Sequence, residues 1–129
     1  MREKSFKILL IEDDQFIRRI CKNGLERSGF NVITAAEGEE GIKKAREQNP
    51  DLILSDLIMP HKNGFEILKQ IKKDKQLKDI PIIILSNLRQ ESDIEKIKEL
   101  GAIDYLIKSD FKIKEVVKKI KLHLAKLKK

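Results

Sequence analysis

Short apolar segments alternate with amphipathic ones along the whole chain. The apolar segments are rich in Ile, Leu and Val, and most of them lack the regular polar alternation of a strand with one solvated face. This pattern predicts strands that are buried on both faces, as in a parallel sheet. The predicted strands are Ile8 to Ile11, Val32 to Ala35, Leu52 to Leu54, Ile82 to Leu85 and Ile103 to Ile107.

The segments between these strands have the spacing of apolar residues that is typical of amphipathic helices. Gly29 and Gly101 stand where the first and fourth helices should end, and Pro81 stands where the fourth strand opens. Five strand–helix units predict an α/β sheet with helices on both faces, formed by one domain over residues 1–129. The residues predicted to share apolar helical faces are Ile17, Ile20, Cys21 and Leu25; Ile42 and Ala45; Phe65, Leu68 and Ile71; Ile94, Ile97 and Leu100; and Ile113, Val116, Val117, Ile120, Leu124 and Leu127.

Composition and charge fit a small globular protein and add few functional signals. Hydrophobic residues make up 40% of the chain, and its net charge of +7 is concentrated in a lysine-rich segment from about residue 112. We interpret that segment as a solvated helix face and a tail, since no recognition motif indicates nucleic acid. The apolar runs are too short to cross a bilayer and no signal peptide begins the chain, so we expect a cytoplasmic protein without membrane insertion.

Cysteine and histidine indicate no site. Cys21 is the single cysteine, so an internal disulfide is excluded, and its place on an apolar helical face favours a packing role. His61 and His123 form no metal-binding or catalytic pattern, and we expect both at the surface.

Polar residues follow most of the predicted strands, at the edge where an open parallel sheet binds its ligands. Each has an ordinary interpretation as well: Asp14 as a helix N-cap, Ser86 as a turn residue and Lys108 as a surface lysine. All of them are nevertheless expected at one edge of the sheet, and this predicts a shared site. These residues are Glu12, Asp13 and Asp14 after the first strand, Asp56 after the third, Ser86 after the fourth and Lys108 after the fifth.

The chemistry of these side chains points to phosphoryl transfer. Neighbouring carboxylates repel unless a cation joins them, and oxygen ligands without His or Cys favour Mg²⁺ or Mn²⁺. Lys108 adds a positive charge, and Ser86 can donate a hydrogen bond to a phosphate oxygen. An aspartate can accept the phosphoryl group as an acyl phosphate, and Asp56 is the best candidate because it stands alone after a central-looking strand.

These residues give the chain a resemblance to the receiver domains of two-component response regulators. The resemblance covers essentially the whole chain and implies a flavodoxin-like (βα)5 fold, doubly wound, with a parallel sheet of strand order 2-1-3-4-5. The segments that carry it are Ile8 to Asp14, Ser55 to Pro60, Asn63 with Gly64, Ser86, and Gly101 to Lys108.

The resemblance also implies a role for each site residue. Asp56 is the expected phosphoacceptor, with Lys108 and Ser86 contacting the phosphoryl group. Ser86 and Tyr105 are the expected switch residues, although an aromatic residue in a strand is usually a packing residue. The expected ligands of Mg²⁺ or Mn²⁺ are the acidic pair Glu12 and Asp13, the carboxylate of Asp56 and the backbone carbonyl of Ile58.

The function implied is a phosphorylation-dependent signalling switch rather than an enzyme. Asp56 would take a phosphoryl group from a sensor histidine kinase or a phosphotransfer protein, with at most self-phosphorylation from small donors and self-dephosphorylation. No further domain is expected after the last helix. Output is therefore expected through contacts with an unidentified downstream protein, made by a monomer or by a phosphorylation-dependent dimer.

Two departures from the family pattern keep an alternative open. Ser109 stands where the family usually has proline, often after a cis peptide bond, and Asn87 stands where it usually has a small residue. A degenerate receiver that serves only as a docking module is the first alternative. The second is a metal-dependent phosphohydrolase with an aspartate nucleophile, which would need a second acid where Ile58 stands. A nucleotide-binding flavodoxin-like module would need a glycine-rich loop in place of Glu12 to Asp14.

Overall fold

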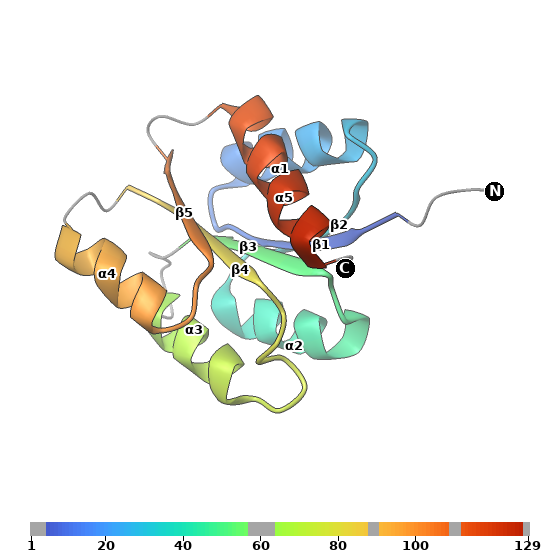
Figure 1. Ribbon diagram of the computed structural model, residues 1–129. Helices are drawn as coiled ribbons and strands as arrows, with labels where there is room; N and C mark the ends of the chain where they lie inside the picture. Colours follow the sequence, from blue (N-terminus) through green and yellow to red (C-terminus); the bar gives the residue numbers. More distant parts are fainter. Residues whose placement is uncertain (1–4, 57–63, 88–90, 109–111, 128–129) are drawn as a thin grey trace.

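The computed structural model describes residues 5–56, 64–87, 91–108 and 112–127, which form alternating strands and helices (Figure 1). The first and fourth helices end two residues before Gly29 and Gly101, as the sequence predicts, and both glycines have positive φ. The elements are β1 (Lys7–Ile11), α1 (Gln15–Arg27), β2 (Asn31–Ala35), α2 (Gly38–Gln48), β3 (Leu52–Asp56), α3 (Gly64–Lys73), β4 (Ile82–Ser86), α4 (Glu91–Glu99), β5 (Asp104–Ile107) and α5 (Ile113–Leu127).

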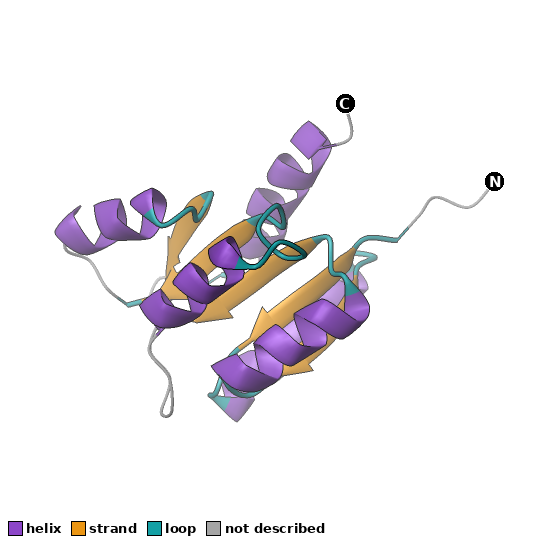
Figure 2. Ribbon diagram, turned by 90° about the horizontal axis from the view of Figure 1, so that it is seen from below, coloured by secondary structure: helices purple, strands orange, loops and turns teal. Residues whose placement is uncertain are grey.

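The strands form one parallel sheet in the order β2-β1-β3-β4-β5, with α1 and α5 on one face and α2, α3 and α4 on the other (Figures 1 and 2). This arrangement confirms the fold class and the strand order expected from the sequence. The residues of β3 and β4 are buried throughout, as predicted for central strands. The edge strand β5 begins at Asp104 rather than at Ile103, which is 39% exposed in the preceding turn.

Two hydrophobic clusters pack on the two faces of the sheet, because successive side chains of a strand point to opposite sides. In β1, Ile8 and Leu10 contact the cluster beneath α1 and α5, and Leu9 and Ile11 contact the cluster beneath α2, α3 and α4. Ile20 departs from the predicted face of α1, since 36% of its surface is exposed. The helix residues that are buried as predicted include Cys21, Leu25, Ile42, Ala45, Leu68, Ile71, Ile97, Val116, Ile120 and Leu124.

Burial raises the pKa of the Cys21 thiol to about 12, which agrees with the packing role expected for this residue. Within the part of the chain that the structure describes, no helix has both the length and the apolar character needed to span a membrane.

Helix α2 lies against β1 through Gly41, and this close approach sets the height of the helix above the sheet. A Cβ atom at position 41 would lie 2.4 Å from Ile11 Cδ1, and because Ile11 is fully buried, its side chain or the helix would have to shift within a packed core. We expect Gly41→Ala to lower the free energy of unfolding by about 1–3 kcal/mol, even though alanine is the better helix former. Urea denaturation measures the change. Lys43→Ala, on the exposed side of α2, should change stability by less than about 0.5 kcal/mol, and equal stability of the two variants would contradict this prediction.

Candidate functional site

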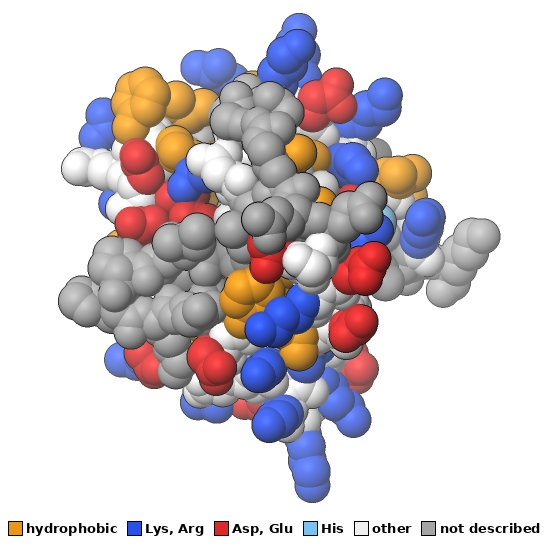
Figure 3. All heavy atoms as spheres, turned by 90° about the vertical axis from the view of Figure 1, so that its left-hand side faces the viewer, with side chains coloured by type: hydrophobic (Ala, Val, Ile, Leu, Met, Phe, Trp, Pro, Cys, Tyr) orange, Lys and Arg blue, Asp and Glu red, His pale blue; other side chains and the backbone are white. Residues whose placement is uncertain are grey.

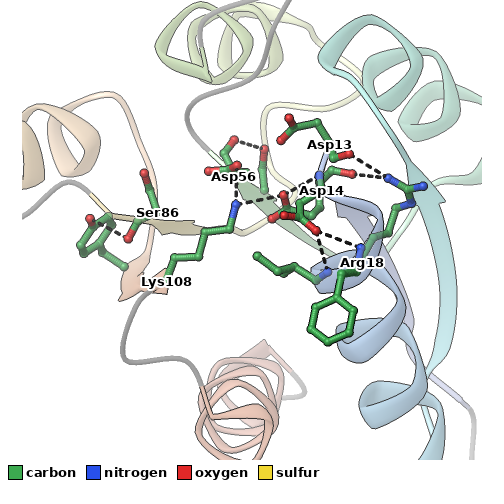
Figure 4. A network of polar contacts seen from close by, with 11 residues as sticks. Asp13, Asp14, Arg18, Asp56, Ser86 and Lys108 are labelled. Carbon is green, nitrogen blue, oxygen red and sulfur yellow. Dashed lines mark hydrogen bonds and ion pairs between the residues drawn. The ribbon is translucent and has the colours of Figure 1, made fainter.

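The carboxyl ends of four parallel strands meet at one edge of the sheet and bring the predicted polar residues together (Figure 4). Glu12 and Asp13 follow β1, Asp56 ends β3, Ser86 ends β4 and Lys108 follows β5. Figure 3 views the molecule from this end and shows acidic side chains gathered beside hydrophobic ones. The ends of parallel strands must share one edge, so residues that are distant in the sequence become neighbours here.

Lys108 joins two of the carboxylates. Its Nζ lies 3.0 Å from Glu12 Oε2 and 2.9 Å from Asp56 Oδ2. Burial acts to lower the pKa of the Lys108 ammonium, but the hydrogen bonds to Asp56 and Glu12 outweigh it and hold that pKa above its usual value. The pocket therefore keeps a fixed positive charge against Asp56.

Three carboxylates lie close enough to share one cation. Single oxygens of Glu12, Asp13 and Asp56 all lie within 4.8 Å of one another. Glu12 and Asp56 are buried, whereas Asp13 is exposed, so the cluster opens to solvent on the side of Asp13. Burial raises the pKa of the Glu12 carboxyl to about 7, although hydrogen bonds from the Asp14 backbone and from Lys108 act to lower it.

The donor set fits a hard divalent cation such as Mg²⁺ or Mn²⁺. Carboxylate oxygens are the ligands that these ions prefer, and Glu12 Oε1 is buried without a hydrogen-bond partner among the residues that the structure describes. A buried carboxylate oxygen in that state is stabilised by a cation. Ile58, the expected carbonyl ligand, lies outside the described residues.

The loop between β1 and α1 is held by several short contacts. Asp14 is the N-cap of α1, as its ordinary interpretation predicts, because its side chain accepts from Phe16 N at 2.9 Å and from Ile17 N at 3.1 Å. The Asp14 N–H in turn donates to Glu12 Oε2 at 3.0 Å. A further contact comes from Arg18 on α1, which the sequence reasoning did not consider and which no motif marks.

Ser86 on β4 and Tyr105 on the neighbouring strand β5 are joined by a hydrogen bond. Ser86 Oγ is buried and has no hydrogen-bond partner within residues 5–56, 64–87, 91–108 and 112–127. The Tyr105 hydroxyl donates to the Ser86 carbonyl oxygen at 3.1 Å, and its half-buried ring packs against the cluster beneath α2, α3 and α4. Buried hydroxyls are usually paired, so Ser86 Oγ has an unused hydrogen bond to offer at the pocket.

Two of the remaining expectations can be compared with the structure. Asn87 is exposed directly after Ser86, whereas the Lys108–Ser109 peptide bond and His61 lie outside the described residues. The expectation that His123 is a surface residue is wrong. Its Nε2 lies 2.8 Å from Asp104 Oδ2, and only 13% of its side chain is exposed because α5 packs this face toward β5.

Lys119 contacts the same Asp104 carboxylate at 3.1 Å. Burial acts to raise the pKa of Asp104, but the hydrogen bonds from His123, from the Tyr105 backbone and from Lys119 hold it below its usual value. This ion-paired group ties α5 to the edge strand β5.

Comparisons with known proteins find relatives of this sequence and of this fold. A family model described as response regulator receiver domain matches residues 8–121. The chain is 41% identical over 115 residues to the alkaline phosphatase synthesis transcriptional regulatory protein PhoP of Bacillus subtilis, covering 89% of this chain and 47% of that protein. It is 45% identical over 101 residues to the transcriptional regulatory protein AfsQ1 of Streptomyces coelicolor, covering 78% and 44%. The chain thus spans about half the length of the curated relatives that it matches.

Two solved structures superpose closely on the fold. The chemotaxis protein CheY4 of Vibrio cholerae has a TM-score of 0.86 and 31% identity, covering 92% of this chain and 98% of that one. The receiver domain of the Francisella response regulator 1452 has a TM-score of 0.87 and 31% identity, covering 97% and 100%. The likeness therefore extends over nearly all of this chain in both cases.

Proposed function

The chain belongs to the response regulator receiver domains of two-component signalling, and from this premise we propose that it is a switch that accepts a phosphoryl group on Asp56. Receiver domains are signalling modules rather than classical enzymes, and response regulators interact with histidine kinases. The donor proposed here is a sensor histidine kinase or a phosphotransfer protein. The output is a contact with a downstream protein, made by a monomer or by a dimer that forms on phosphorylation.

The observation that carries the proposal is the surroundings of the Asp56 carboxylate. It is 4% exposed, it lies 2.9 Å from the Lys108 ammonium, and it shares a 4.8 Å cluster with the carboxylates of Glu12 and Asp13. A carboxylate oxygen that attacks phosphorus forms an acyl phosphate as the bond from phosphorus to the donor breaks, and Asp56 then carries the phosphoryl group. The reaction depends mainly on positioning and charge neutralisation, which these surroundings favour.

Glu12, Asp13 and Asp56 would hold Mg²⁺ or Mn²⁺, with the Ile58 carbonyl as the further ligand that the resemblance implies. When bound, the ion would neutralise the charge that gathers on the transferring phosphoryl oxygens. Lys108 pairs with Asp56 before transfer, and its ammonium contacts a phosphoryl oxygen afterwards. Glu12 shares Lys108 and keeps the ammonium within the pocket during this exchange.

Ser86 and Tyr105 would convert the new charge into a structural signal. Phosphorylation adds roughly −1.5 to −2 charges at neutral pH. Ser86 Oγ then donates its unused hydrogen bond to a phosphoryl oxygen and draws the end of β4 toward Asp56. Because the Tyr105 hydroxyl is bonded to the Ser86 carbonyl, the movement reaches the edge strand β5, where a partner can read it. The population shifts only as far as the phosphoryl group distinguishes the two states.

Incubation with acetyl phosphate, followed by intact mass spectrometry, tests the proposed function. We expect one phosphoryl adduct in the presence of Mg²⁺ and none after EDTA removes the divalent cation. A chain that forms no adduct with acetyl phosphate or with other small phosphodonors would contradict the proposal and favour a docking module. Sustained hydrolysis of an external phosphate ester would instead favour the phosphohydrolase alternative.

A further inference from the structure

Arg18 reaches from α1 back over the loop that carries the acidic pair (Figure 4). Its Nη1 donates to the Glu12 carbonyl oxygen at 2.8 Å and more weakly to the Asp13 carbonyl oxygen at 3.4 Å. The side chain is half-buried, so solvent competes only partly for these bonds. Both contacts are with the main chain, so Arg18 acts on the path of the loop rather than by pairing with its carboxylates.

The two carbonyl groups flank the Cα atom of Asp13, which lies between two other points where the loop is held. On one side, the Glu12 N–H donates to the Ala35 carbonyl at 3.0 Å and ties the loop to the sheet. On the other side, Asp14 is fixed as the N-cap of α1. Asp13 lies between them with an exposed carboxylate that is repelled by the carboxylates of Glu12 and Asp56. A single guanidinium nitrogen that holds both flanking peptides resists this repulsion.

We infer that Arg18 is a positioning residue that holds Asp13 in the geometry needed to bind the divalent cation. This inference rests on the proposed function, because it assigns Arg18 a part in the same pocket. The charge of Arg18 alone would act in the opposite direction, since a positive group near the pocket repels Mg²⁺. If Arg18 acts by positioning Asp13, replacing it should weaken Mg²⁺ binding. If it acts only through its charge, replacing it should strengthen Mg²⁺ binding.

Arg19 supplies a matched control. It is the next residue of α1, it has the same charge, and its exposed side chain makes no hydrogen bond or ion pair with the residues that the structure describes. Arg18→Ala and Arg19→Ala remove one positive charge each, and alanine favours the helix in both cases. Arg18→Lys keeps the charge but replaces the planar guanidinium with a single ammonium on a flexible side chain. We expect this variant to bind Mg²⁺ with an affinity between those of wild type and Arg18→Ala.

Titration calorimetry with Mg²⁺ on the four proteins, together with unfolding temperatures in EDTA, tests the inference. We expect Arg18→Ala to bind Mg²⁺ roughly tenfold more weakly than wild type, the usual effect of losing a group that orients a ligand. Arg19→Ala should stay within about twofold, because an exposed charge is well screened.

The outcomes separate this inference from the proposed function. If wild type binds Mg²⁺ and forms the adduct while Arg18→Ala binds Mg²⁺ as tightly as Arg19→Ala, the inference about Arg18 alone is overturned. A lowered unfolding temperature in EDTA with unchanged Mg²⁺ affinity would assign Arg18 a purely structural role and overturn it as well. A wild-type protein that binds no Mg²⁺ would overturn the proposed metal site and this inference together.

Discussion

Asp56→Asn is expected to abolish the phosphoryl adduct that the wild-type chain forms with acetyl phosphate and Mg²⁺. Asparagine has almost the shape of aspartate and still offers an oxygen to Lys108, so the pocket should keep its packing. Its amide is not a nucleophile toward phosphorus, because no carboxylate oxygen remains to form the acyl phosphate. Intact mass spectrometry under the wild-type conditions measures the loss, and circular dichroism checks that the variant is folded.

Asp14→Asn is the matched control for this experiment. Like Asp56→Asn, it removes one negative charge, in this case from the loop that carries Glu12. Asparagine caps a helix about as well as aspartate does, so α1 should keep its N-cap. The adduct should therefore form on Asp14→Asn. An adduct of equal yield on Asp56→Asn would show that another group accepts the phosphoryl, and the assignment of Asp56 would be wrong.

The strands and helices could be predicted from the sequence because their signals are local. A run such as Leu52 to Leu54 reads as a buried strand without knowledge of its neighbours, and Gly29 marks a helix end by its own conformational freedom. The order of the strands carries no such local signal, since it depends on which distant segments pair. It was available only through the family resemblance, and the pairing of β1 with both β2 and β3 confirms it.

The candidate site shows the same division. The proximity of Glu12, Asp56 and Lys108 could be predicted from the sequence, because residues at the carboxyl ends of parallel strands share an edge in any such fold. The contact of Arg18 could not be predicted, because its long side chain bends back to main-chain carbonyl groups. Every residue has such a carbonyl, so the sequence gives no signal for this contact. The partnership of His123 with Asp104 was missed for a related reason, since it joins a helix to a strand through tertiary packing.

Glu12→Gln is expected to stabilise the metal-free protein at pH 8 by about 2 kcal/mol. The pKa of Glu12 is about 7 in the folded protein, against 4.5 as its usual value. Between these two values the unfolded chain releases the proton while the folded chain retains it. The folded state therefore binds more protons, and the contribution of Glu12 to the free energy of unfolding falls as pH rises through this window, by up to about 3 kcal/mol.

Glutamine removes this titration but still offers an oxygen to the Asp14 N–H and to Lys108, so part of the full effect is offset by a weaker contact with the ammonium. Urea denaturation in EDTA at pH 4.5 and at pH 8 measures the difference in the free energy of unfolding between Glu12→Gln and wild type. The other titrating groups contribute nearly equally to both proteins, so their contributions largely cancel in this difference. The gain should be present at pH 8 and nearly absent at pH 4.5, where wild-type Glu12 is also largely protonated.

Glu47→Gln, at an exposed position of α2, should differ from wild type by less than about 0.5 kcal/mol at both pH values. A Glu12→Gln protein that is less stable than wild type at pH 8 would mean that the ion pair with Lys108 outweighs burial, which is the opposite sign. Mg²⁺ should reverse the comparison, because a bound cation stabilises the ionised carboxylate and glutamine cannot supply that charge. The carboxylate that weakens the metal-free fold would then be the one that couples folding to cation binding.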